Sequence, residues 1–180
     1  MSRLIILLLF VTPVNLFAQQ NLQFIGEKID FAINKERFFI NGIYYFSNSS
    51  ETEIKQTILF PFSKGADSLM VKRVFNLTYS ENLSFQHLNG SIAFKILVLS
   101  KDTVKVNIAY SQKTESENVY VLESTQTWGK ALKIADYSLE FEPSVQIDSL
   151  SLTPDSLINN IYYWKRQDFY PNDNFIVWIK

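Results

Sequence analysis

The chain has 180 residues, of which 47% are hydrophobic, 15% aromatic and 19% charged, and its 17 basic and 18 acidic side chains give a net charge of −1. This balance lacks the excess of basic charge that nucleic-acid binding needs, and the aromatic content and moderate charge argue against a disordered chain. Because the sequence has no cysteine and one histidine, it excludes disulfides, thiol catalysis, cysteine-based metal sites and every site that needs two histidines.

Residues 1–18 have the pattern of a secretory signal peptide. Arg3 precedes an apolar run from Leu4 to Val11, and Ala18 supplies the small residue that cleavage requires. The run is too short for a comfortable bilayer span, and no later stretch approaches about 20 apolar residues. We therefore expect an exported chain, periplasmic or extracellular, with no stable membrane insertion and, lacking cysteine, no lipid anchor. Residues 19–180 are expected to form a single domain.

Apolar residues recur at every second position in this domain. The alternation marks residues 28–33, 53–62, 69–79, 92–98, 104–110 and 137–141, and an apolar run follows at 175–179. Many short runs of period two are typical of half-buried antiparallel strands, and no segment supports a long amphipathic helix. The sequence predicts an all-β fold, an antiparallel two-sheet sandwich (Ig-like or related) of about nine or ten strands.

Turn residues predict how some of these strands connect. Asn89-Gly90 favours a two-residue type I′ hairpin turn. A three-residue loop at 100–102 keeps the apolar residues in phase and extends this hairpin into a three-stranded meander over 84–111. A further hairpin is expected across 63–68. At Asn41-Gly42 the apolar positions stay in phase across the pair, which favours one long strand with a bulge.

Residues 43–62, IYYFSNSSETEIKQTILFPF, predict a strand, a polar turn and a second strand. Asn and Ser favour the turn, and Pro61 stops strand pairing. With Phe46, Asn48 and Ser50 at the turn and Phe60-Pro61-Phe62 at the end, this stretch resembles a pattern near the start of vault/inter-alpha-trypsin-like domains and of exported bacterial β-sandwich proteins of unknown function. The resemblance implies a β-sandwich used as an interaction module, and it implies no catalytic or metal-binding residue.

An aromatic cluster near the end of the chain supplies the candidate binding residues. These are Tyr162, Tyr163, Trp164, Phe169 and Tyr170. Consecutive residues on a strand point to opposite faces, so we expect some of the first three rings to face away from the core. Exposed rings stack on sugars or on peptide side chains and anchor interfaces. The alternative is that the rings seal one end of the sandwich.

Candidate catalytic groups are few. His87 is predicted at a hairpin end, where a structural residue at the rim of the core is expected, and the chain has no Gly-x-Ser-x-Gly motif. Glu140 and Glu142 lie ~7 Å apart on one strand face, a separation that carboxylate-based glycan hydrolases use. Alternation of glutamate with apolar residues is, however, also typical of a solvated sheet face. Asp168 is a third candidate carboxylate.

These observations predict a non-enzymatic binding or assembly module of the cell envelope. Its partner is expected to be a protein or a glycan, with no cofactor and no metal, and the sequence leaves its oligomeric state open. One alternative is a glycan hydrolase that uses Glu140 and Glu142, or Asp168. The other is an eight-stranded outer-membrane barrel, which has a similar size and aromatic content.

Overall fold

The computed structural model describes residues 21–63 and 69–180. The predicted signal peptide, residues 1–18, and most of the predicted turn at 63–68 therefore lie outside the described part of the chain. Most of the described residues lie in strands, and their one helix is a short 3-10 helix, η1 (Glu123–Trp128). No helix within these described ranges has the length and the apolar character needed to cross a membrane.

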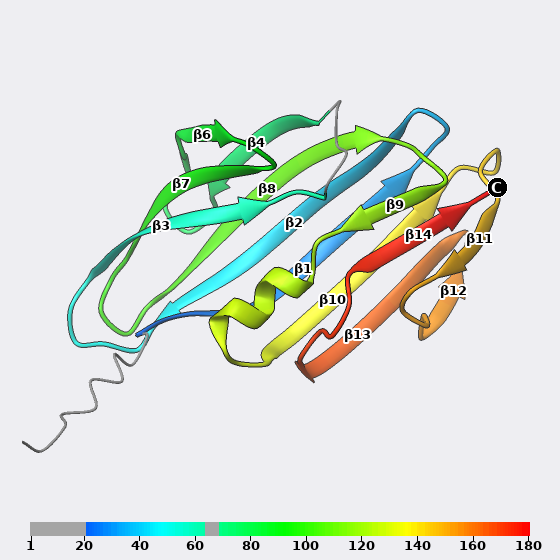
Figure 1. Cartoon of the computed structure of the whole chain (residues 1–180). Helices are drawn as coiled ribbons and strands as arrows, with labels where there is room; N and C mark the ends of the chain where they lie inside the picture. The colour runs from blue at the N-terminus through cyan, green and yellow to red at the C-terminus, as the bar shows by residue number, and fades with distance from the viewer. Residues whose placement is uncertain (1–20, 64–68) are drawn as a thin grey trace, which may run out of the picture.

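An eight-stranded sheet forms the larger layer of the fold (Figure 1). In spatial order its strands are β12 (Ser156–Ile158), β13 (Ile161–Phe169), β10 (Leu132–Phe141), β1 (Leu22–Ile33), β2 (Arg37–Asn48), β8 (Thr103–Lys113), β4 (Met70–Asn76) and β5 (Glu81–Asn82). Neighbouring strands are antiparallel except for β1 and β10, which are parallel. The sheet is open, with β12 and β5 at its edges, so the closed eight-stranded alternative is wrong.

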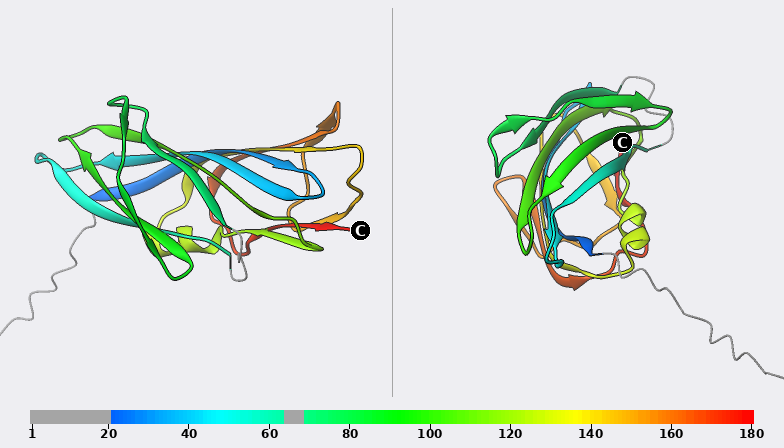
Figure 2. Two further views of the ribbon diagram at one scale, coloured as in Figure 1. Left: turned by 90° about the horizontal axis from the view of Figure 1, so that it is seen from above. Right: turned by 90° about the vertical axis from the view of Figure 1, so that its left-hand side faces the viewer.

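Two three-stranded sheets form the second layer and lie in front of the larger sheet in Figure 1. One has the order β3 (Ile54–Pro61), β7 (Ser91–Val98) and β6 (Phe85–Leu88). The other has the order β11 (Ile147–Leu150), β14 (Phe175–Ile179) and β9 (Glu117–Tyr120). The other views of Figure 2 show the layers around a common interior. The predicted all-β two-layer sandwich is confirmed.

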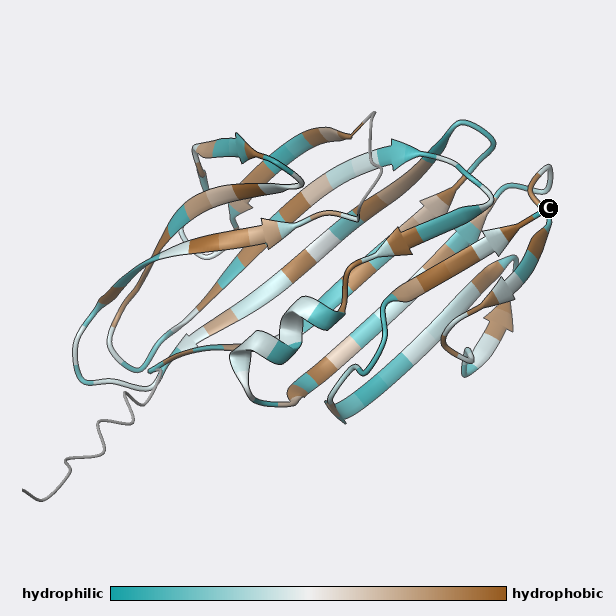
Figure 3. Cartoon of the chain, viewed as in Figure 1, coloured by the Kyte–Doolittle hydropathy of each residue, from teal (hydrophilic) through white to brown (hydrophobic). Residues whose placement is uncertain are grey.

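The alternating sequence pattern builds the core. Along the long strands, hydrophobic and hydrophilic residues follow one another in bands (Figure 3), and the hydrophobic set points between the layers. Phe31 of β1 stacks on Phe175 of β14 with ring centroids 4.5 Å apart, and Trp164 of β13 meets Phe175 edge-on at 5.2 Å. All three side chains are fully buried, so these contacts fasten the eight-stranded sheet to the second layer.

The predicted two-residue hairpin at Asn89-Gly90 is confirmed, but of this pair only Gly90 has a positive φ, so the turn is not the predicted type I′. The predicted meander is wrong. Strands β6 and β7 pair across this turn with Leu88 opposite Ser91. Strand β8 then crosses to the other layer, where it pairs with β2 and β4 rather than with β7. Val98 and Val104 are both fully buried, because a strand that changes layer can bury the same alternate residues as one that stays. The hairpin across 63–68 is also wrong, since β3 and β4 lie in different layers.

Residues Asn41-Gly42 lie within a single strand, as predicted, but no bulge lies there. Gly42 instead leaves room for the side chain of Tyr44, two positions further along the strand. A Cβ atom at Gly42 would collide with the phenol ring of Tyr44. The bulge lies instead in the neighbouring strand β1, between Phe24 and Gly26.

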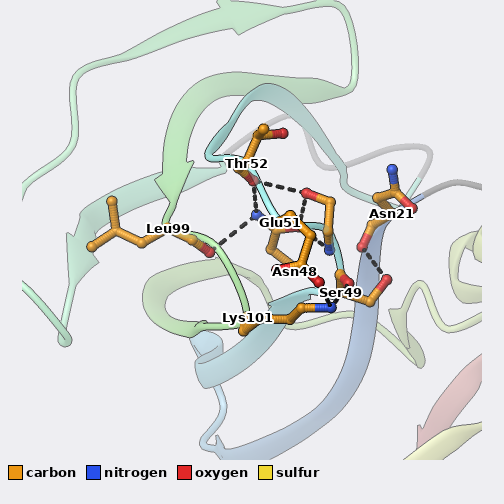
Figure 4. Close-up of polar contacts among 8 residues, drawn as sticks. Asn21, Asn48, Ser49, Glu51, Thr52, Leu99 and Lys101 are labelled. Atoms are coloured by element: carbon orange, nitrogen blue, oxygen red, sulfur yellow. Dashed lines mark hydrogen bonds and ion pairs between the residues drawn. The ribbon is translucent and has the colours of Figure 1, made fainter.

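The turn after β2 is organised by Asn48, which is 1% exposed (Figure 4). Its amide nitrogen donates to the carbonyl oxygens of Thr52, Val98 and Leu99 at 2.7–3.1 Å, and its amide oxygen accepts from the backbone and the hydroxyl of Ser50. Asn48 therefore joins the turn that leads into β3 to the turn that leads out of β7. The Asn and Ser of the family-like pattern hold two connections between the layers together.

Candidate functional site

The bulge in β1 turns an acidic side chain into the core. Before the bulge the buried residues are Leu22 and Phe24, and after it they are Glu27, Ile29 and Phe31. Because side chains alternate, one extra residue reverses the phase of all later residues. Without the bulge the carboxyl of Glu27 would point to the solvent face.

At the bulge, the backbone of Gly26 packs against the backbone of β10. A Cβ atom at Gly26 would lie 2.8 Å from the carbonyl oxygen of Ile134. Backbone atoms cannot move out of the way as a side chain can, so glycine is the residue that this approach requires. Gly26 and the bulge together determine where Glu27 lies.

Glu27 is held by tyrosine hydroxyls from two other strands. The hydroxyl of Tyr137 on β10 donates to Oε1 at 2.6 Å, and the hydroxyl of Tyr120 on β9 donates to Oε2 at 3.0 Å. The hydroxyl of Tyr44 on β2 lies 3.2 Å from that of Tyr120. Glu27 is 1% exposed, and no lysine or arginine in the described ranges forms an ion pair with it. Its partners in the fold are neutral donors.

Burial raises the pKa of the Glu27 carboxyl from 4.5 to about 7, while the hydrogen bonds from Tyr137 and Tyr120 act in the opposite direction. Burial also raises the pKa of Tyr44, Tyr120 and Tyr137 well above 10. The tyrosines therefore stay protonated at neutral pH and act as hydrogen-bond donors. Glu27 is the group of this cluster that changes charge near neutral pH.

A cavity of about 230 Å³, which we call the Glu27 cavity, lies between the layers beside this cluster. Strands β1 and β2 line it from the larger layer, β3 from one small sheet, and the end of β9 with η1 from the other. Its lining residues are Phe24, Glu27, Tyr44, Phe46, Ile58, Leu59, Phe60, Pro61, Tyr120, Val121, Ser124, Thr125, Thr127 and Trp128. Strands β3 and β9 belong to separate sheets, so the cavity occurs where the second layer is divided.

The rim of the Glu27 cavity is exposed and its interior is aromatic. Leu59 on β3 is 61% exposed and Thr127 on η1 is exposed. Inside, the ring of Trp128 lies 6.1 Å from that of Phe24 and 5.8 Å from that of Phe46. The cavity therefore combines aromatic rings with a single carboxyl.

The structure does not bring the predicted aromatic residues together into one surface. Trp164 is fully buried, and its Nε1 donates to the carbonyl oxygen of Leu152 at 3.1 Å. Tyr162, on the same face of β13, is half-buried and stacks on Phe141. Tyr163, half-buried, lies at the intervening position and so on the opposite face.

The other two predicted aromatic residues lie at the far end of β13. Phe169 is half-buried and Tyr170 is 45% exposed. Both line a second cavity of about 180 Å³ beside the turn at 171–174. Tyr162 and Tyr163 are not among the lining residues of this second cavity.

The predicted catalytic carboxylates lie on the surface. Glu140 and Glu142 are exposed and line a depression of about 350 Å³ at the end of β10. Asp168 is also exposed but lies near the opposite end of the neighbouring strand β13. His87 is exposed, with its ring 5.2 Å from that of Phe85. Across the described ranges, no three His, Cys, Asp or Glu residues gather in a group that could hold a metal ion.

Sequence reasoning missed Glu27, although the sequence carries a signal for it. Leu22 and Phe24 are apolar at even positions, whereas Ile29, Phe31 and Ile33 are apolar at odd positions. A reversal of phase within one strand indicates a bulge, and the glycine at position 26 marks where it occurs. The same phase reversal places residue 27 on the buried face.

The sequence matches no family model and no curated protein. Solved structures of similar fold include a protein of Legionella pneumophila whose proposed role is nutrient binding, with a TM-score of 0.67 and 12% identity over 88% of this chain and 67% of that one. An M1 zinc metallopeptidase of Deinococcus radiodurans is similar with a TM-score of 0.55 and 8% identity over 89% of this chain and 43% of that one.

A third similar structure is the leukotriene A4 hydrolase of Saccharomyces cerevisiae, with a TM-score of 0.55 and 13% identity over 88% of this chain and 29% of that one. This chain spans less than half the length of the metallopeptidase and of the hydrolase. Identities of 8–13% show a shared fold alone. The chain is thus defined by its architecture, a two-layer β-sandwich that also occurs as part of larger enzymes.

Proposed function

We propose that this chain is an exported, non-enzymatic binding module that holds a small ligand in the Glu27 cavity. The observation that carries the proposal is a buried carboxyl, aimed into the core by a bulge, at one side of an aromatic cavity between the layers. Aromatic and apolar walls with a few convergent polar groups are the usual composition of a small-molecule site. The pattern of residues 1–18 supports export, and the fold likeness to the Legionella protein supports a binding role.

The size of the Glu27 cavity limits the ligand. A volume of about 230 Å³ exceeds the roughly 150 Å³ cavity that holds a benzene molecule, and it falls below the roughly 300–1,000 Å³ of sites for drug-sized molecules. A ring with a short substituent is therefore the size of ligand that fits. Glu27 is the only carboxylate among the lining residues, so hydrolysis by a pair of carboxylates has no second partner here.

The proposal is tested by saturation-transfer NMR on the mature chain, residues 19–180, with a panel of small amines, alcohols, carboxylates and monosaccharides. Ser124→Trp fills the cavity from η1, whereas Glu123→Trp adds the same side chain at the exposed neighbouring position, which does not line the cavity. Circular dichroism checks that both variants fold. We expect at least one compound to bind the wild type and Glu123→Trp but not Ser124→Trp. If Ser124→Trp abolishes no binding signal, the proposal is wrong.

A further inference from the structure

The carboxyl of Glu27 is buried without a compensating charge. Its two hydrogen-bond donors, Tyr137 and Tyr120, are neutral, and each carboxylate oxygen accepts from one of them. An ionised carboxylate can accept about four hydrogen bonds, so half of its accepting capacity is free. Buried charges in proteins are normally paired. The fold thus satisfies only part of the hydrogen-bonding capacity of the Glu27 carboxylate. The charge of this carboxylate has no ion-pair partner among the described residues.

The walls of the Glu27 cavity favour the same kind of partner. Ring faces carry negative electrostatic potential and attract cations, and five aromatic residues line the cavity besides Tyr120: Phe24, Tyr44, Phe46, Phe60 and Trp128. The other polar lining side chains are the hydroxyls of Ser124, Thr125 and Thr127, all on η1. An anionic ligand would meet a carboxylate of like charge, and a sugar would leave most of its hydroxyls against apolar walls.

We propose that the ligand is a small organic ammonium compound whose charged nitrogen pairs with Glu27 and whose apolar body lies against the rings of Phe24, Phe46 and Trp128. This inference rests on the proposed function, because it assigns a ligand class to the same cavity. The ammonium group supplies the missing counter-charge and up to three hydrogen-bond donors. The limited volume favours a free amine, although a lysine side chain of a partner presents the same chemistry.

Three compounds of one shape test the ligand class at pH 7.5: phenethylamine, phenethyl alcohol and phenylacetate. Isothermal titration calorimetry on the mature chain should show the amine binding at least tenfold more tightly than the alcohol, with no binding of the acid. In Glu27→Gln the amine should lose this advantage while the alcohol still binds, a result that misfolding would not give. Glu123→Gln, which removes an exposed carboxylate of η1, should keep the preference of the wild type.

The outcomes separate this inference from the proposed function. If the alcohol or the acid binds as tightly as the amine and Ser124→Trp abolishes that binding, the cavity is a ligand site but the ammonium class is wrong. If Glu27→Gln keeps the preference for the amine, the pairing with Glu27 is wrong. A peptide with a single internal lysine serves as a further probe, and tighter binding than phenethylamine would support the ammonium class with a protein as its source.

The pH dependence of amine binding is an independent arm of the test. The titratable groups packed around Glu27 are Tyr44 of β2, Tyr110 of β8, Tyr120 of β9 and Tyr137 of β10, and the pKa of each is raised above 10. Arg166 of β13 is a cation that acts on this cluster, through Tyr137. Of the groups in this cluster, Glu27 is the one whose pKa of about 7 lies between pH 6 and pH 8, so the affinity for phenethylamine should rise about tenfold over this range. A flat profile would contradict the pairing.

Discussion

Replacing Glu27 by glutamine removes a carboxyl whose burial makes the stability of the fold depend on pH. The pKa of Glu27 is about 7 in the folded protein, against 4.5 for an unperturbed carboxyl. Between these values the folded state holds the proton more tightly than the unfolded state, so the free energy of unfolding falls as the pH rises. The interval is about 2.5 pH units, which at about 1.4 kcal/mol per unit gives a loss of about 3 kcal/mol, of which about 2.5 kcal/mol falls between pH 5 and pH 8.

Glutamine has nearly the same shape and no charge, so Glu27→Gln should lack this loss. Urea unfolding of both proteins at pH 5 and pH 8 measures it as a double difference, in which the contributions of all other groups cancel. We expect the variant to gain about 2.5 kcal/mol relative to the wild type between pH 5 and pH 8. Glu123→Gln, at an exposed site, should show no such gain. Parallel pH profiles for Glu27→Gln and the wild type would refute the reasoning.

Three further predictions follow from individual contacts. Tyr137→Phe removes the 2.6 Å hydrogen bond to Glu27, so the Glu27 pKa should rise above 7, as an NMR titration of its carboxyl carbon can measure. Asn48→Asp replaces the amide that donates to three carbonyl oxygens by a carboxylate, which cannot donate. In urea unfolding this variant should lose about 3 kcal/mol or more of its free energy of unfolding, a larger loss than that of Asn48→Ala. Trp164→Ala, at a fully buried site, should lower the free energy of unfolding by about 3–5 kcal/mol. Tyr163→Ala, at a half-buried site, should lower it by less than half as much, and thermal unfolding of both variants measures the difference.

The pattern of buried and exposed residues was predictable because it is local. Alternation along a strand depends only on backbone geometry, so the sequence indicates which side chains of 92–98 and 104–110 face inward, and the structure buries them. The choice of partner is not local. Val98 and Val104 reach one core from opposite layers, and alternation is the same whether a chain turns back in its sheet or crosses to the other.

The candidate site was only partly predictable for the same reason. The reversal of phase at Gly26 can be read within a single strand, and it places Glu27 inside. The two tyrosines that hold its carboxyl, Tyr120 and Tyr137, are 93 and 110 residues away in the sequence. Nothing local to either tyrosine indicates a carboxylate partner, so their convergence appears only once the strand order is known.

For the aromatic cluster at 162–164, the local sequence pattern predicts some features of the structure and not others. It predicts that neighbouring rings face opposite ways, and Tyr163 and Trp164 do. It does not predict which face the second layer covers. That layer lies over Trp164, where Phe175 of β14 meets it, and the ring becomes part of the core rather than of a binding surface.

Several features around Glu27 lower the stability of the fold, so stability does not explain why they are present. A bulge interrupts strand pairing, a glycine at position 26 loses more entropy on folding than another residue would, and a cavity between the layers forgoes packing among its lining side chains. A buried carboxyl is costly as well, since replacing buried ionic groups by apolar ones of similar volume is often neutral or stabilising. In this fold the four features coincide where the two small sheets of the second layer separate. Local rules of stability are expected to fail together at a functional site, and their coincidence here is the physical basis of the proposed ligand site beside Glu27.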